Sequence, residues 1–392
     1  MKQTIIVSMA IAVFFTTACN PSPIPPIISA MAPSSTAITV DNSATLVQLA
    51  EFSQGEKGPV AALAFTPNRT ELRVVHARTP LLRHWSVLDH KMLAEYELES
   101  VGLGAVAFDE TASLIVLAGF ANDQIFGDDY MRGISAEQLF GPHDGIYFVD
   151  AESGQLLNRL RRPGNKEDFY GVALSRDGRI VATRRTEDLE QTIILDQKPE
   201  LLVFEVSDRS APASLLFSTA HSQGDFALDV EGRFLAIHAD HNGVVQLWDL
   251  ESQREWGDLK LSTNRSGTET SYFATKMAIA PTRQWLAVFS IVDSGDYPDL
   301  RQVTLWRLDE RQVQWQTEID ARYVNAFAFN PFGTLLAAGA SDGAHIWNVE
   351  TGEEVKFFPG ESAFAVAFSQ DGSQVAWGDR AGVVHLAGLP VK

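Results

Sequence analysis

The sequence predicts an all-β protein, a seven-bladed β-propeller with four-stranded antiparallel blades. Three observations predict this fold: a short apolar segment recurs seven times, each recurrence opens a unit of about 40 residues, and an extra strand before the first unit can complete the last one. The length agrees, because 392 residues exceed the ~250–300 at which one continuous core usually stops growing. A chain of this length divides into domains or repeats.

Each unit opens on a short strand that ends in a tight turn. Apolar residues alternate at period two, and Asp, Asn, Pro or Gly then ends the strand. The seven segments are ALAFTPN at 62–68, AVAFDET at 105–111, GVALSRDG at 171–178, FALDVEG at 226–232, KMAIAPT at 276–282, AFAFNPFG at 326–333 and AVAFSQDG at 365–372.

Three more strands follow in each unit. The second reads LRVVHA in the first copy and FLAIHA in the fourth, the third often ends in an aromatic residue, and a weaker fourth strand such as EEVKFF leads into the next copy. Four short antiparallel strands per unit are typical of a propeller blade.

On these residues the chain resembles the WD-repeat β-propeller family over residues 45–392. The Trp-Asp dipeptide at 248 and 249 and the Ser-Asp-Gly turn at 341–343 keep the family pattern, whereas Asn348 and Arg307 follow their tryptophans and the usual Gly-His pair is missing from nearly all copies. The resemblance therefore implies the fold but not the family's internal His–Asp hydrogen-bond network. The blade-structural residues that it implies are Trp85, Trp248, Asp249, Trp306, Asp342, Gly343 and Trp347.

Closure of the ring supports the count of seven. The last copy ends at its third strand, VVHLAGLPVK, and TLVQLAEF at 45–52 has the alternation of an outermost strand. Pairing of the two would join the ends of the chain and remove an open sheet edge.

The first 18 residues have the layout of a secretory signal. Lys2 precedes an apolar run at 5–15 and then small residues; the run is shorter than the ~20 residues that span a bilayer. Residues 16–19, Thr-Thr-Ala-Cys, resemble the lipobox of bacterial lipoproteins, although Thr16 stands where that family usually has Leu. The resemblance implies lipidation of Cys19, the single cysteine. An ordinary signal peptide with a stray thiol is the alternative.

Residues 19–44 read as the anchor cysteine and a Pro-rich tether, with prolines at 21, 23, 25, 26 and 33. Such a segment prefers extended conformations of ~3.1 Å per residue, and it precedes the propeller at 45–392. This layout predicts a protein of the bacterial cell envelope, lipid-anchored to a membrane on its periplasmic side or at the cell surface. The formal net charge of −19 argues against a nucleic-acid partner, since phosphate binding needs clustered Lys and Arg.

Three copies carry long connections between their second and third strands, at 119–145, 184–200 and 290–302. In the family these connections emerge on one face, and enlarged loops on a rigid scaffold are where binding residues usually lie. The partner-binding candidates are Phe126, Asp128, Asp129, Tyr130, Met131, Phe140, Asp293, Asp296 and Tyr297.

Two other interpretations of these loops remain open. Their apolar residues can fold back onto the blade, and Asp128, Asp129, Asp293, Asp296 and Asp299 supply the oxygen donors that a divalent cation prefers. No single loop has regular calcium-ligand spacing, so the sequence predicts solvated charges and no metal.

Three short motifs imitate functional sites. Residues 339–343 fit the G-x-S-x-G pattern of hydrolases and residues 102–107 a dinucleotide fingerprint, but a strand follows each where the chemistry needs a helix. His238 and His241 flank Asp240 without a clear third ligand. The sequence therefore predicts no catalytic residue and no cofactor.

The leading hypothesis is a non-catalytic, monomeric scaffold that binds protein partners and is held at a membrane by its lipid alone. The alternative is a propeller enzyme or a ligand or metal sensor whose site lies at the mouth of the central channel.

Overall fold

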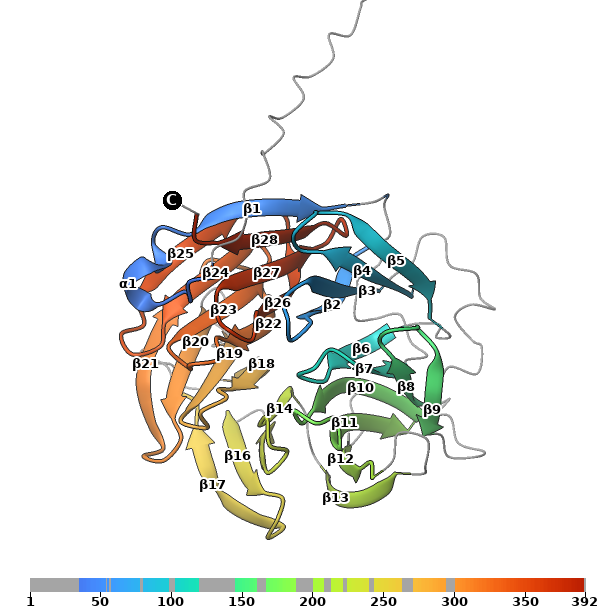
Figure 1. Cartoon of the computed structure of the whole chain (residues 1–392). Helices are drawn as coiled ribbons and strands as arrows, with labels where there is room; N and C mark the ends of the chain where they lie inside the picture. The colour runs from blue at the N-terminus through green and yellow to red at the C-terminus, as the bar shows by residue number, and fades with distance from the viewer. Residues whose placement is uncertain are drawn as a thin grey trace, which may run out of the picture.

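Seven four-stranded antiparallel sheets surround a common centre in this computed structural model (Figure 1). It describes residues 35–390 except 54, 56–57, 78–79, 99–102, 120–144, 161–166, 188–199, 208–212, 221–223, 240–242, 263–270 and 294–299. Each sheet is one blade, and the first strand of each full repeat lies nearest the centre (Figure 1). The predicted all-β, seven-bladed fold is confirmed.

The strands follow the seven repeats in order. Blade 1 consists of β2 (Val60–Phe65), β3 (Glu71–His76), β4 (Leu81–Ser86) and β5 (Met92–Glu97). Blade 2 consists of β6 (Leu103–Phe108), β7 (Leu114–Gly119), β8 (Ile146–Asp150) and β9 (Leu156–Leu160). Blade 3 consists of β10 (Glu167–Leu174), β11 (Ile180–Glu187), β12 (Glu200–Glu205) and β13 (Ser214–Ala220).

The second half of the ring has the same order. Blade 4 consists of β14 (Phe226–Leu228), β15 (Phe234–His238), β16 (Val244–Asp249) and β17 (Arg254–Lys260). Blade 5 consists of β18 (Ser271–Ile279), β19 (Trp285–Asp293), β20 (Leu300–Arg307) and β21 (Gln312–Glu318). Blade 6 consists of β22 (Val324–Phe329), β23 (Leu335–Ala340), β24 (Gly343–Asn348) and β25 (Glu354–Pro359).

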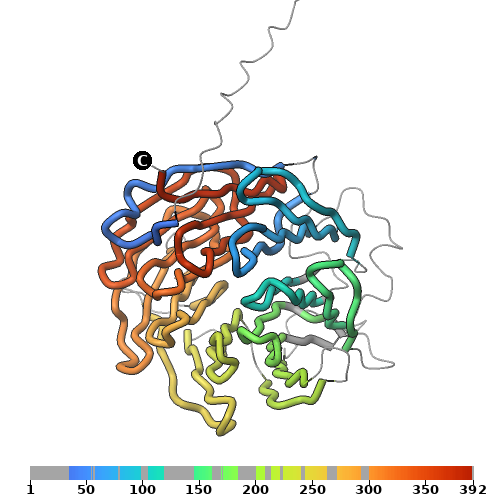
Figure 2. The backbone as a smooth tube through the Cα atoms, viewed as in Figure 1, coloured from blue at the N-terminus to red at the C-terminus, as the bar shows by residue number. Residues whose placement is uncertain are grey.

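Blade 7 closes the ring with strands from both ends of the chain. It consists of β26 (Ala363–Phe368), β27 (Gln374–Asp379), β28 (Val384–Gly388) and β1 (Val47–Phe52). Val47 lies opposite Gly388 and Phe52 opposite Val384, so the blue and red ends run side by side (Figure 2). Leu49 and Phe52 are fully buried in the core between blades 7 and 1. The predicted closure by an N-terminal strand is confirmed.

The repeated strand order gives the disc two distinct faces. Turns from first to second and from third to fourth strands leave one face, which we call the turn face. Connections from second to third strands, and from each blade to the next, leave the opposite face, which we call the insertion face.

The chain before β1 is packed on the turn face. Ile38 is fully buried, and its N–H donates to the carbonyl oxygen of Gly372, in the first turn of blade 7, over 2.7 Å. A helical turn, α1 (Val40–Ser43), follows, and the side chains of Thr39 and Asn42 cap its start. The packed body thus includes residues that the sequence alone grouped with the tether.

A buried polar side chain stabilises most of the first turns. In Asp109, Asp229 and Asn330, one Oδ1 accepts the N–H groups four and five residues later; for Asp109 the distances are 2.7 and 2.8 Å. In blades 1, 3 and 7 a hydroxyl accepts the later N–H. These groups satisfy backbone donors that burial hides from water. The hydroxyls belong to Thr66, Ser175 and Ser369.

The third residue after each of these six positions, and after Ala280 at the same place in blade 5, has positive φ, which glycine adopts without strain. Gly occupies it in four blades, whereas the other three use non-glycine residues. The seven residues are Arg69, Ala112, Gly178, Gly232, Arg283, Gly333 and Gly372, with φ between 53° and 71°. The first turn therefore keeps the same backbone conformation in all seven blades, although the residue type at this position differs.

The residue after the blade tryptophan caps the outer turn. Asp249 accepts the N–H of Ser252 over 3.0 Å, a contact that lowers the pKa of Asp249. Asn348 and Ser86 accept backbone N–H groups at the equivalent place, so these two departures from the family dipeptide keep its hydrogen bond. Arg307 does not, and its guanidinium lies 4.7 Å from the ring of Trp285.

The other blade-structural candidates lie within or at the edges of the cores. Trp85, Trp306 and Trp347 are buried between blades, and Trp248 packs on Phe217 with ring centroids 5.0 Å apart. Asp342 contacts His345 of its own blade at 3.0 Å. Gly343 has φ 135°, and a Cβ there would collide with the carbonyl oxygen of Phe358.

Closure by β1 should carry much of the stability. We expect Leu49→Ala to lower the free energy of unfolding by about 2–5 kcal/mol, because it leaves a cavity in the core. Val47→Ala, on the same strand but more than a third exposed, should cost under about 0.5 kcal/mol. Urea unfolding measures both.

Deletion of residues 45–54 should unfold the protein or make it oligomerise through the exposed edge of β28. A monomeric deletion variant with an unchanged urea midpoint would show that closure does not hold the ring.

Two turn aspartates, the buried Asp229 and the partly exposed Asp371, should respond to pH in opposite directions. Burial raises the pKa of Asp229 above its ordinary value of 3.8, so its contribution to stability is largest below 3.8 and is lost as pH rises through the folded-state pKa. Asparagine keeps the Oδ1 acceptor and does not ionise. Asp229→Asn should therefore gain stability relative to the wild type between about pH 3.5 and 7.

Asp371→Asn is the matched control. Although burial opposes the shift, hydrogen bonds from Ser373 and Ser369 and the charge of Arg69 lower the pKa of Asp371. Its contribution is present above 3.8 and is lost as pH falls, so this variant should become less stable relative to the wild type as pH rises. Urea titrations at several pH values that gave both variants the same sign would contradict the assignment.

Candidate functional site at the central channel

Most sequence-predicted loop residues lie outside the described part of the chain. This holds for Cys19 and for Phe126, Asp128, Asp129, Tyr130, Met131, Phe140, Asp296 and Tyr297. Asp293 ends β19, where only its backbone is described.

The attachment points of the three long connections are described. They join β7 to β8, β11 to β12 and β19 to β20. Since the strand order is the same in blades 2, 3 and 5, all three leave from the insertion face.

The first two strands of blades 3, 4 and 5 differ in length. The first two strands have eight residues each in blade 3 and nine each in blade 5, and both pairs are extended at their insertion-face ends. In blade 4 between them, β14 has three residues and β15 has five. The strands that border the mouth of the channel at this face therefore differ in length from blade to blade.

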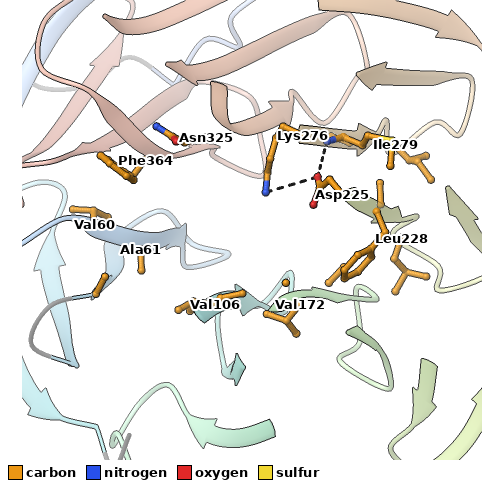
Figure 3. A pocket seen from close by; sticks show the side chains of 18 of the residues that line it. Val60, Ala61, Val106, Val172, Asp225, Leu228, Lys276, Ile279, Asn325 and Phe364 are labelled. Carbon is orange, nitrogen blue, oxygen red and sulfur yellow. Dashed lines mark hydrogen bonds and ion pairs between the residues drawn. The ribbon is translucent and has the colours of Figure 1, made fainter. Parts of the chain in front are cut away.

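A cavity of about 430 Å³ occupies this mouth of the channel (Figure 3). First strands of all seven blades line it, mainly with small or apolar side chains. Those labelled in Figure 3 are Val60, Ala61, Val106, Val172, Asp225, Leu228, Lys276, Ile279, Asn325 and Phe364.

One ion pair interrupts the apolar lining. Asp225 and Lys276 occupy the same place in neighbouring blades, four residues before the capping position of the first turn. The other five blades have alanine or glycine there, namely Ala62, Ala105, Gly171, Ala326 and Ala365. The fold therefore does not require a charge at this position.

The two charged groups are held differently. The N–H of Met277 donates to Oδ2 of Asp225 over 2.7 Å, and this bond joins the first strands of blades 4 and 5. Nζ of Lys276 lies 3.9 Å from the same oxygen, and its side chain is about a third exposed. The carboxylate is thus fixed by the backbone, while the ammonium can turn toward a bound group. Nearby, Nδ2 of Asn325 donates to the carbonyl oxygen of Ala363.

Hydrogen bonds join the turns of neighbouring blades at the opposite end of the channel. The N–H of Glu110 donates to the carbonyl oxygen of Arg176, and the N–H of Arg176 to that of Val230. The amide of Gln370 reaches from blade 7 past blade 1 to the carbonyl oxygen of Glu110 over 2.6 Å. A cavity of about 550 Å³ lies at this end. Both ends of the channel therefore carry a cavity, and the one at the turn face is the larger.

Sequence reasoning missed this ion pair. The signal was present, because alignment of the seven first strands sets Asp225 and Lys276 against five small residues.

The short motifs that imitate functional sites either have structural roles or lie partly outside the described residues. Ser341 lies between β23 and β24, and its Oγ accepts the N–H of Arg322. His238 is buried at the end of β15, whereas Asp240 and His241 are not described.

The described ranges contain neither a metal-binding cluster nor a helix that could cross a membrane. They hold no group of three or more His, Cys, Asp or Glu residues placed to bind a metal ion. None of their helices has the length and apolar character needed to cross a membrane.

Residues 316–348 match the family model described as WD domain, G-beta repeat. The match covers the end of β21 and all of β22, β23 and β24. No curated protein sequence matches the chain. The match and the seven blades together support the WD-repeat propeller family, which is typically non-catalytic and mediates protein interactions.

The Asp225–Lys276 pair should contribute little to folding. Because both groups are partly exposed, we expect a coupling energy below about 1 kcal/mol in a double-mutant cycle with Lys276→Ala and Asp225→Ala. Asp225→Ala alone should cost about 1–3 kcal/mol, since the N–H of Met277 loses its acceptor. Urea unfolding measures each value, and a coupling of several kcal/mol would make the pair structural.

Proposed function

We propose that this protein is a membrane-tethered, non-catalytic scaffold that mediates protein–protein interaction in the bacterial cell envelope. One observation carries the proposal: a closed ring presents three long connections, from blades 2, 3 and 5, on a single face. The WD-repeat match supports an interaction role.

The mechanism is rigid display. The β1–β28 pairing holds the blades in a ring, so the points where the long connections leave the blades keep their spacing while a partner binds. The apolar and aromatic residues of the blade 2 connection, Phe126, Tyr130, Met131 and Phe140, suit the buried centre of a protein contact.

The lipid anchor is the second part of the proposal. Support comes from the signal-like start, the lipobox-like residues 16–19 and the Pro-rich segment after Cys19. Attachment to a membrane restricts the search for a partner to a surface and raises the effective concentration. Expression in the native host with Cys19→Ser should move the protein from the membrane fraction to the soluble fraction. Unchanged membrane association would contradict lipidation at this residue.

Loss of two aromatic side chains should separate binding from folding. Tyr130→Ala and Phe140→Ala should each weaken partner capture by about tenfold or more, as expected for contact hot spots, without lowering the melting temperature. Leu93→Ala, at an exposed position of β5, is the matched control and should change neither. Equal loss of capture and stability would mean that the aromatic residues pack on their own blade.

Photo-cross-linking from position 130 in the native host tests the scaffold directly. One dominant protein adduct, lost in the Phe140→Ala background, is the expected result. A well-expressed, anchored protein that gives no adduct would contradict a partner at this loop.

A ligand sensor is the second candidate, because the ion pair of Asp225 and Lys276 lies in the channel mouth without being needed by the fold. Metal content of the purified protein and its melting curve with and without chelator distinguish the two functions. A stoichiometric metal that raises the melting temperature would favour the sensor.

A further inference from the structure

Two exposed apolar side chains stand on the turn face. Phe332, in the first turn of blade 6, is 51% exposed, and Leu88, in the outer turn of blade 1, is 63% exposed. Single exposed apolar residues are common. These two matter because of what lies between them.

Contacts join the two positions through blade 7. The ring of Phe332 lies against Gly372, where a Cβ would come within 2.8 Å of its Cε2. Asp371 pairs with Arg69 of blade 1 at 2.7 Å. In blade 1 the N–H of Val87, next to Leu88, donates to the carbonyl oxygen of Thr70. We call the surface of blades 6, 7 and 1 between Phe332 and Leu88 the apolar strip, after the two apolar side chains at its ends.

The chain that leads back to Cys19 joins the body inside this strip. Ile38 is buried there, and its N–H donates to the carbonyl oxygen of Gly372, the residue that Phe332 covers. Residues 35–46 therefore fix the point of attachment on the turn face, whatever conformation the preceding residues adopt.

The charge of the strip suits a neutral surface. Arg69 and Asp371 neutralise each other in its middle, whereas the whole chain carries a formal net charge of −19. Exposed Leu and Phe tips on turns can enter the boundary between head groups and acyl chains. A zwitterionic bilayer accepts such tips without the repulsion that anionic lipids exert on an acidic protein.

We propose that the apolar strip rests on the zwitterionic lipid surface to which the protein is anchored, so that the insertion face points away from the membrane. This orientation rests on the proposed lipid anchor. It places the connections of blades 2, 3 and 5 and the channel mouth toward the aqueous compartment, where a soluble partner can reach them.

The test attaches the mature chain to lipid chemically. Cys19 is the only cysteine, so its thiol can be coupled to maleimide-bearing lipid in phosphatidylcholine vesicles whether or not the cell lipidates it. Amide hydrogen exchange is then compared with and without vesicles. We expect slower exchange in the turns at 86–91 and 330–334 and no change in the insertion-face turn at 341–342.

Substitution of Leu88 and Phe332 tests whether these side chains contact the lipid. Leu88→Ser combined with Phe332→Ser should abolish the slowing while the protein stays coupled, and both side chains are exposed enough for the fold to tolerate the change. Phe273→Ser, at a half-exposed position of β18 toward the insertion face, should leave the slowing intact. Vesicles rich in phosphatidylglycerol should give less slowing than phosphatidylcholine.

Slowing at 341–342, or equal exchange at 86–91 and 330–334 with and without vesicles, would overturn the orientation. Neither result would affect the proposed anchor, which the membrane fractionation of Cys19→Ser tests separately.

Discussion

The pairing of β1 with β28 is the constraint on which the rest of this structure depends. Every other blade is built from one continuous segment, but blade 7 needs strands from both ends of the chain. A missing β1 would leave a full-length unpaired edge and open the core that Leu49 and Phe52 share with blade 1. The ring is closed because the two ends of the chain meet in blade 7. The three long connections leave from one face because the blades share one strand order.

Local hydrogen bonds make the repeat tolerant of sequence change. The first turn needs a buried acceptor and a residue with positive φ, and Asp, Asn, Ser or Thr can supply the acceptor. The outer turn likewise accepts Asp249, Asn348 or Ser86. Six of the seven first turns thus have a side-chain acceptor for the same backbone N–H, although the residue that supplies it differs.

Departures from sevenfold symmetry locate the features available for function. The first two strands of blades 3 and 5 are longer than those of blade 4. A charged pair replaces small residues where the first strands of blades 4 and 5 meet. On the turn face, the entering chain, Phe332 and Leu88 share one sector. A ring of identical blades would have none of these features, and the proposed division between a partner face and a membrane face rests on them.

The sequence by itself determined the strand order, the number of blades and the closing strand, because alternation at period two and turn residues are local signals. It also grouped the three long connections on one face. Only the tertiary structure paired Asp225 with Lys276, since these residues lie 51 positions apart and approach each other through the neighbouring strands of two blades. The same holds for Ile38, whose burial against Gly372 depends on closure of the ring. Such contacts join distant segments, and no local pattern of residues specifies them.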